Sequence, residues 1–175
     1  MRKSLASILT IILLAACNLP TSTPDNFPTT ASSQNCVLTW AYQSLPGPTV
    51  KVQSALTSAG LTGVSVEVEA YGENCTDPQT NKPVSFSTLE TDFYITVKMA
   101  NLTDKAAMGN SLEKILVVLD AFPVGQIPGP QPGNVSVSFE AGSDRLNIMF
   151  TVPAGKSARL IGLHGAALFD KLQKK

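Results

Sequence analysis

Residues Val64 to Tyr71 read VSVEVEAY and alternate between apolar and polar side chains. The three valines and Ala70 fall on one face of an extended chain, while Glu67, Glu69 and Tyr71 fall on the other. This period of two is typical of a strand with one buried side and one side that faces solvent. The stretch therefore predicts a sheet with one covered face and one open face.

The same alternation recurs in three further segments of the chain. Phe93 to Ala100 forms one of them, and the segments 135–139 and 146–152 flank the turn sequence Ala141-Gly142-Ser143-Asp144, which predicts a hairpin. Cys36 to Gln43 suits only a short strand or an extended lead-in. We therefore expect four strands in the sheet.

Three other segments change to the 3.6-residue spacing of a helix. Thr49 can cap a helix that is expected to run to about Ala59. A second helix starts after Thr103 or Asp104 and ends before Pro123, because proline cannot continue a helix. A final helix is expected over 157–172.

These elements predict an α+β fold, a four-stranded, mainly antiparallel sheet with helices packed on one face, in the order (β)αββαββα. The helices carry apolar stripes that suit them to cover the apolar side of the strands. A β-sandwich is the main alternative, but the stripe from Met108 to Phe122 has helical spacing.

The start of the chain has a different character. Arg2 and Lys3 precede an apolar run from about Leu5 to Ala16, which is the layout of a secretory signal peptide. A membrane-spanning helix needs about 20 apolar residues, more than this run provides. An ordinary cleaved signal peptide or a short anchor helix would also fit this pattern.

The sequence Leu14-Ala15-Ala16-Cys17 resembles the lipobox of bacterial lipoproteins. This resemblance implies that the chain is cut before Cys17, that Cys17 carries a diacylglyceryl thioether, and that the new amino terminus is acylated, for example with palmitate. In two-membrane bacteria, Asp after the cysteine usually signals retention in the inner membrane, and this chain has Asn18 there. We expect an exported protein, lipid-anchored to a cell membrane and facing the periplasm or the exterior.

The predicted organisation has three parts: a lipoprotein signal peptide at 1–16, the lipidated cysteine with a disordered Pro/Thr/Ser tether at 17–35, and a single α+β domain at 36–175. The tether has too few apolar side chains to bury. Without residues 1–16 the chain has 11 basic and 13 acidic residues, a net charge of −2. This balance and the lack of a basic cluster argue against a nucleic-acid partner.

Two cysteines, Cys36 and Cys75, remain after Cys17. In an exported protein such a pair usually forms a disulfide, although two free buried thiols are the alternative. Cys75 is expected in a polar loop from Gly72 to Pro83. Two cysteines and the single His164 make a poor ligand set, so neither a metal nor a cofactor is expected.

Motifs for catalysis are weak. Ser111 and Lys114 match the S-x-x-K pattern of penicillin-binding enzymes, but the partner motifs of that class are missing, and the middle of a helix suggests a solvated face. A nucleophilic triad would need His164, for which packing near Leu160 and Leu168 is the simpler expectation. We therefore assign no catalytic residue.

Other polar and aromatic residues leave binding open. Glu67 and Glu69 lie about 7 Å apart along one strand face, a separation that glycosidase carboxylates also use. Calcium is a further possibility, without the usual 12-residue spacing. Its candidate oxygens come from Glu73, Asn74, Asp77, Glu90 and Asp92. An aromatic strip could include Trp40, Tyr42, Tyr71 and Tyr94, although packing at the edge of the core would also explain them.

The favoured interpretation is a membrane-anchored envelope lipoprotein with a non-enzymatic domain that binds an envelope protein or polymer. The candidate binding surface consists of Tyr71, Tyr94, Glu67 and Glu69 on the open face of the sheet. The alternative is a small envelope hydrolase that acts on wall or glycan through its carboxylates.

Overall fold

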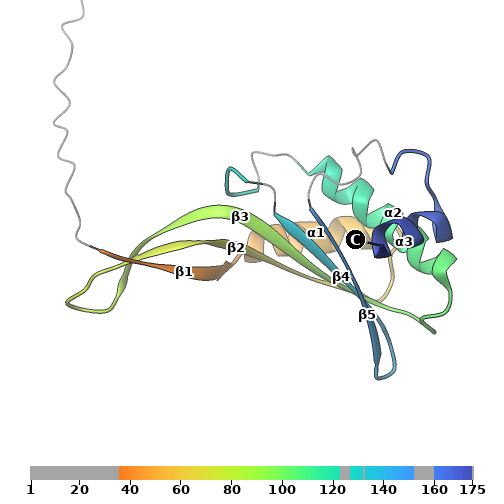
Figure 1. The fold of residues 1–175 in the computed structure, drawn as a ribbon, viewed down its shortest axis with the longest axis horizontal. Coiled ribbons are helices and arrows are strands. Elements are labelled where there is room, and N and C mark those ends of the chain that lie inside the picture. Colours follow the sequence, from red (N-terminus) through yellow and green to blue (C-terminus); the bar gives the residue numbers. More distant parts are fainter. Residues whose placement is uncertain (1–35, 123–126, 132, 152–159, 175) are drawn as a thin grey trace, which may run out of the picture. The chain divides into compact units, whose positions relative to one another are not determined.

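The computed structural model describes residues 36–122, 127–131, 133–151 and 160–174, and its elements follow the order βαββαββα (Figure 1). The strands are β1 (Val37–Ser44), β2 (Val64–Thr76), β3 (Pro83–Lys98), β4 (Asn134–Ala141) and β5 (Asp144–Thr151). The helices are α1 (Pro46–Ser58), α2 (Lys105–Ala121) and α3 (Gly165–Gln173). The predicted α+β class is confirmed.

The strands form one curled sheet in the order β1-β2-β3-β4-β5. Neighbouring strands are antiparallel except β3 and β4, which are parallel and are connected through α2. The sheet is therefore mixed and mostly antiparallel. The prediction of four strands was wrong, because residues 37–44 pair with β2 along their whole length and add a fifth strand. Both faces of β1 are exposed, so the alternation of its side chains does not separate a buried side from a solvent side.

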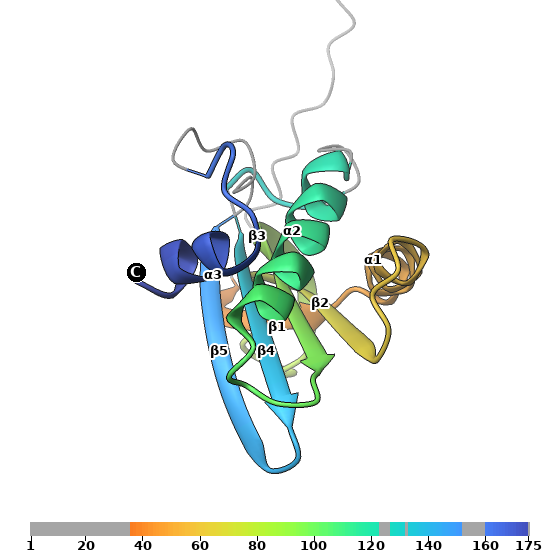
Figure 2. The ribbon, with the colours of Figure 1, turned by 90° about the vertical axis from the view of Figure 1, so that its right-hand side faces the viewer.

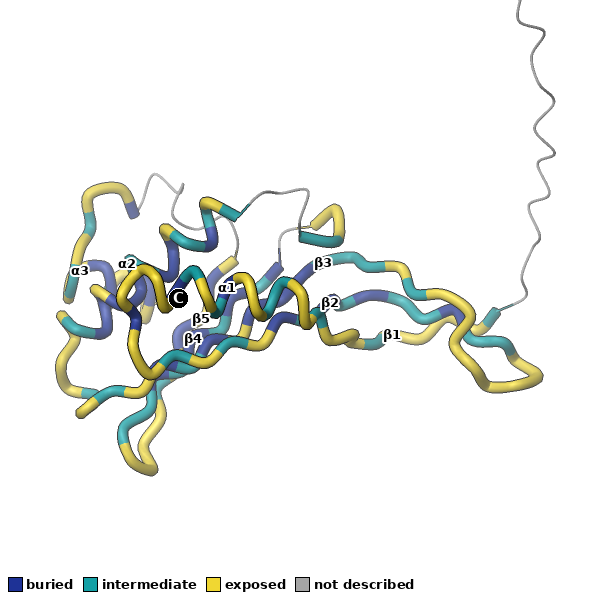
Figure 3. The backbone as a smooth tube through the Cα atoms, turned by 180° about the vertical axis from the view of Figure 1, so that it is seen from behind, coloured by how far each residue is buried: buried dark blue, intermediate teal, exposed yellow. Residues whose placement is uncertain are grey.

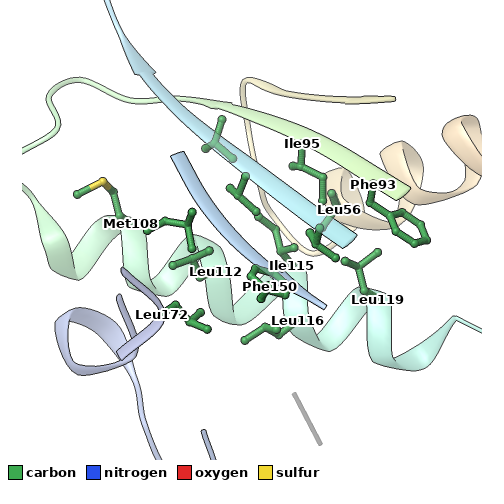
Figure 4. Packing of buried hydrophobic residues seen from close by; sticks show 14 of the residues in the cluster. Leu56, Phe93, Ile95, Met108, Leu112, Ile115, Leu116, Leu119, Phe150 and Leu172 are labelled. Carbon is green, nitrogen blue, oxygen red and sulfur yellow. The ribbon is translucent and has the colours of Figure 1, made fainter. Parts of the chain in front are cut away.

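A single core joins one face of the sheet to all three helices (Figures 2 and 4). Val52 and Leu56 of α1 belong to this cluster, together with Phe93 of β3 and Leu168 of α3. The longest contribution comes from α2, whose buried residues are Met108, Gly109, Ser111, Leu112, Ile115, Leu116 and Leu119. Its predicted cap is confirmed, because the Asp104 side chain accepts a hydrogen bond from the backbone N–H of Ala107 at 2.9 Å.

The β2–β3 hairpin is longer than the sequence predicts. Cys75 lies in β2 rather than in a loop, and the turn is confined to the residues between Thr76 and Pro83. Asp77 organises this turn, because its Oδ1 atom accepts hydrogen bonds from the backbone N–H groups of Gln79 and Thr80. Figure 1 shows that these strand ends extend beyond the helices that cover the core.

The expected disulfide between Cys36 and Cys75 is present, with the two Cα atoms 5.2 Å apart. It joins the start of β1 to the end of β2. The register supports this link, because Leu38 lies opposite Cys75 and Val37 lies opposite Thr76. The disulfide therefore holds the exposed edge strand against the rest of the sheet.

Two helices begin at residues other than those predicted. Helix α1 starts at Pro46, since prolines in a first turn lack only N–H groups that have no helical partner there. Thr49 is inside this helix, and its hydroxyl accepts a hydrogen bond from the backbone N–H of Val68 at 3.1 Å. Helix α3 starts at Gly165, after a turn in which Gly162 has a positive φ of 76°. The earlier part of that expected helix, 157–159, lies outside the described residues.

Candidate functional site

The sheet register brings the four predicted binding residues to one face. Glu67 and Tyr94 are direct partners across β2 and β3. Glu69 and Tyr71 follow on the same side of β2, because side chains alternate along a strand. This side is opposite the one that carries the buried Val68 and Ala70. We call it the open face, and its aromatic and acidic residues on β1, β2 and β3 are Trp40, Tyr42, Glu67, Glu69, Tyr71, Glu73, Glu90, Asp92 and Tyr94.

Three aromatic rings form a cluster at the β1 end of the open face. Tyr42 lies opposite Tyr71 in the register, with 4.9 Å between the ring centroids. Trp40 stacks on Tyr71 at 5.3 Å with 15° between the ring planes. Tyr71 is half-buried between them, whereas Trp40 and Tyr42 are 59% and 57% exposed. Aromatic side chains of this size are usually buried or in contact with a ligand, so their exposure marks a surface suited to binding.

Four carboxylates lie near this aromatic cluster. Tyr71 lies opposite Glu90, Trp40 lies opposite Glu73, and Glu69 lies opposite Asp92. Asp92 is only 5% exposed, and its Oδ1 atom accepts a hydrogen bond from the backbone N–H of Asn134 at 2.7 Å. That bond joins β3 to the start of β4 and holds a carboxylate in the middle of the open face.

Burial, and then neighbouring charge, raises the pKa of two of these acids. Desolvation raises the pKa of Glu69 above its ordinary value, and the neighbouring Glu67 and Asp92 charges raise it further. Desolvation and then Asp92 raise the pKa of Glu90. The pKa of the Tyr94 phenol is also raised, first by desolvation and then by Asp92. The open face is therefore a region of negative potential.

Cations lie only at the far end of the open face within the five described strands. Lys98 of β3 and Arg145 of β5 both form ion pairs with Glu140 of β4. These bonds lower the pKa of Glu140 below its ordinary value, with the Lys98 hydrogen bond as the larger cause. Both cations are thus engaged by Glu140, and the carboxylates near the aromatic cluster have no strand cation beside them.

The S-x-x-K residues do not form a catalytic pair. Ser111 is largely buried rather than solvated, and its hydroxyl donates a hydrogen bond to the backbone carbonyl of Ala107 at 3.1 Å. The Lys114 ammonium instead donates to the carbonyl of Gly60 at 3.0 Å. Both residues border a pocket of about 300 Å³, but their polar atoms contact different backbone carbonyls.

The side chain of His164 is 70% exposed, and it borders a pocket together with Leu160 and Leu168. Its Nδ1 atom is 2.9 Å from Oε1 of Glu113, so it connects the start of α3 to the outer side of α2. In the described part of the chain, no three His, Cys, Asp or Glu side chains are grouped closely enough to hold a metal ion. The predicted calcium carboxylates of Glu73, Asp77, Glu90 and Asp92 therefore form no such group.

Sequence reasoning named Trp40 and Tyr42 as a possible strip without including them in the binding surface. The available signal was the period of two in Leu38, Trp40 and Tyr42, which places three large side chains on one side of an extended segment. Leu38 is 59% exposed on that same side. The sequence spacing does not predict that Glu73 and Glu90 lie next to these rings. Their positions follow only from the pairing register of β1, β2 and β3.

The predicted lipidation site, Cys17, and the tether at 17–35 lie outside the described residues. Within the described ranges, none of the helices combines the length and the apolar character needed to cross a membrane. No protein-family model, no curated protein and no solved structure matches this chain.

Proposed function

We propose that this chain is a lipid-anchored envelope protein whose open face is a non-enzymatic binding surface. The observation that carries the proposal is the exposed aromatic cluster of Trp40, Tyr42 and Tyr71 beside a group of carboxylates. Rings bring a large contact area with few rotatable bonds, so ordering them on binding costs little entropy. The pairing of β1 with β2 and the contacts between the rings hold them together in the absence of a ligand.

The anchor supports a partner in the cell envelope. The lipobox-like sequence ending in Cys17 implies attachment to a bilayer, and two or more acyl chains give stable anchoring. A protein held at a membrane surface meets neighbouring envelope proteins and polymers at high local concentration. The proposed partner is therefore an envelope protein or an envelope polymer.

A carboxylate hydrolase is the second candidate, and one observation favours it. The raised pKa of Glu69 beside Glu67 and Asp92 is a property of general acids in glycoside hydrolysis. Screening wall and glycan substrates with the wild type, Glu67→Gln and Glu69→Gln tests this candidate. Turnover that both substitutions abolish would favour the hydrolase over the binding module.

Proximity labelling of the anchored protein in its own cell tests the binding proposal. Tyr71→Ala combined with Tyr94→Ala removes two rings from the open face. The matched control combines Val50→Ala with Ile161→Ala, which are exposed apolar residues outside the sheet. We expect the tyrosine variant to lose a labelled partner that the wild type and the control retain. Identical labelling of all three proteins would eliminate the open face as the binding surface.

A further inference from the structure

Within the described residues, the outer edge of β1 presents a row of backbone groups that no other strand pairs with. β1 is the first strand in the sheet order, so among the described residues it pairs only with β2. Its eight residues, VLTWAYQS, include no proline and no charged side chain. Pairing with β2 runs without a bulge from Val37 to Ser44. Figure 3 shows β1 exposed along nearly its whole length.

Proteins usually protect sheet edges with charged residues, proline, a bulge or a covering segment. The opposite edge strand, β5, begins with Asp144 and Arg145 and contacts α3. Within the described ranges β1 has none of these protections. Its outward backbone N–H and C=O groups are therefore suited to β-augmentation, in which an extended chain joins the sheet as a new strand.

We propose that β1 adds an extended segment of a partner protein as a sixth strand, and that this segment carries lysine or arginine at alternate positions. The inference rests on the proposed function, because the alternate side chains would lie on the open face. A strand added to β1 would be about 4.8 Å away from it. Its side chains on that face would lie beside Leu38, Trp40 and Tyr42, and a cation over an exposed indole or phenol ring is attracted by the ring.

The negative charge of the open face favours a cationic partner segment. Glu73 and Glu69 lie on β2, directly behind β1, and so about 10 Å from an added strand. The strand cations of this face, Lys98 and Arg145, are both paired with Glu140. A long lysine or arginine side chain extending over β1 would approach these carboxylates and lower the local negative potential.

A second copy of this chain fits the same edge less well. Antiparallel pairing of two β1 strands would join the two open faces into one surface. Each copy would bring its own Glu67, Glu69, Glu73, Glu90 and Asp92 to that surface. Repulsion between these like charges disfavours this arrangement, whereas a cationic strand would neutralise part of the negative charge.

Trp40 provides a direct test, because it is the only tryptophan of the chain and lies at the proposed contact. The full chain is titrated with an eight-residue peptide in which lysine alternates with threonine. The control peptide has the same composition with its four lysines consecutive, so they cannot all lie on one side of a strand. We expect the alternating peptide to shift Trp40 emission and to protect amides of 37–44 from hydrogen exchange, and the control to bind about tenfold more weakly.

A third peptide, with the alternating sequence and methylated backbone nitrogens, retains the charges but lacks the donors for strand pairing. We expect it to leave the amides of 37–44 unprotected.

Equal binding of all three peptides would overturn strand addition, because only charge would then matter. Failure of every peptide to affect Trp40 would overturn the cationic partner. A dimer of the chain alone with protected 37–44 amides would identify a second copy as the occupant. The labelling experiment with Tyr71→Ala and Tyr94→Ala judges the proposed function independently of these results.

Discussion

The indole ring of Trp40 lies almost parallel to the phenol ring of Tyr71 on the neighbouring strand, with 5.3 Å between the ring centroids. This contact is diagonal in the register, because Trp40 pairs directly with Glu73 and Tyr71 pairs with Tyr42. It therefore links the edge strand to β2 through side chains as well as through the backbone. Since the chain has no other tryptophan, this pair also makes the candidate site visible to spectroscopy.

Replacement of Tyr71 with leucine should loosen this edge. Tyr71→Leu retains an apolar side chain but removes the ring that contacts both Trp40 and Tyr42. We expect a weaker near-ultraviolet circular dichroism signal from Trp40 and a free energy of unfolding lower by about 0.5–1.5 kcal/mol. Tyr94→Leu is the control, because Tyr94 lies on β3, two strands away from Trp40. An unchanged aromatic signal in Tyr71→Leu would contradict the stacking.

Close contact between α2 and α3 predicts that Gly109 tolerates no side chain. A Cβ atom at Gly109 would lie 1.8 Å from the backbone oxygen of Gly165. Gly109→Ala should therefore push α3 away and lower the free energy of unfolding by about 1–3 kcal/mol, as overpacking does. Gly47→Ala in α1 is the matched control, since its Cβ would meet nothing within 4 Å. Equal urea midpoints for the two variants would show that α3 is not packed this closely.

Strong periodicity made much of this fold predictable. The alternation in Val64 to Tyr71 and the helical stripe of 108–122 each reflect burial on one side, and both elements are present. Burial of one side leaves an apolar–polar pattern in the sequence, whereas β1 is exposed on both sides, so the period of two in Leu38, Trp40 and Tyr42 does not mark a buried face. The parallel pairing of β3 with β4 depends on how the chain passes through α2, which local periodicity does not record.

The candidate site was predictable in part, because spacing along one strand predicts which side chains share a face. Tyr71 and Glu69 share a strand with a clear period of two, so their common face follows from spacing alone. Their neighbours Trp40, Glu90 and Asp92 come from other strands, and only the register places them nearby. The polar neighbours of Cys75 predict a loop there, yet this residue lies in β2 and pairs with both β1 and β3.

The disulfide should contribute strongly to stability. Cys36 and Cys75 are 39 residues apart, and closing a loop of that length stabilises the folded state by about 4 kcal/mol in the chain-entropy model. Cys36→Ala combined with Cys75→Ala should lower the free energy of unfolding by roughly this amount in urea titrations. A reducing agent should lower the free energy of unfolding of the wild type and leave that of the double variant unchanged. Two titratable thiols in the untreated wild type, besides Cys17, would refute the bond.

The acidic groups on the sheet predict that the free energy of unfolding is highest at a pH near the ordinary carboxyl pKa. The pKa values of Glu69 and Glu90 are raised in the folded state, so the folded state binds their protons more tightly than the unfolded state. Stability should therefore fall as pH rises from the ordinary carboxyl value through the raised values. The pKa of Glu140 is lowered, so its contribution is present above the ordinary value and is lost as pH falls through the lowered one.

Urea unfolding at a series of pH values separates these two effects. Glu69→Gln combined with Glu90→Gln should flatten the decline on the alkaline side of the maximum. Glu140→Gln should instead lower stability at neutral pH and flatten the decline on the acid side, because the ion pairs with Lys98 and Arg145 are lost. A double glutamine variant with the same alkaline decline as the wild type would show that these two carboxyls are not the cause.

Lipidation of Cys17 is open to direct measurement. If the lipobox resemblance reflects processing, the native protein begins at Cys17, carries acyl chains and partitions into the detergent phase, since two or more chains anchor stably. Cys17→Ser removes the thiol that forms the thioether, so it should yield an uncleaved or soluble chain without lipid. Cys36→Ser is the control, because it removes a different thiol and should keep the lipid mass. Intact-mass analysis distinguishes these species, and a native chain that begins at Met1 or carries no fatty acyl group would exclude lipidation.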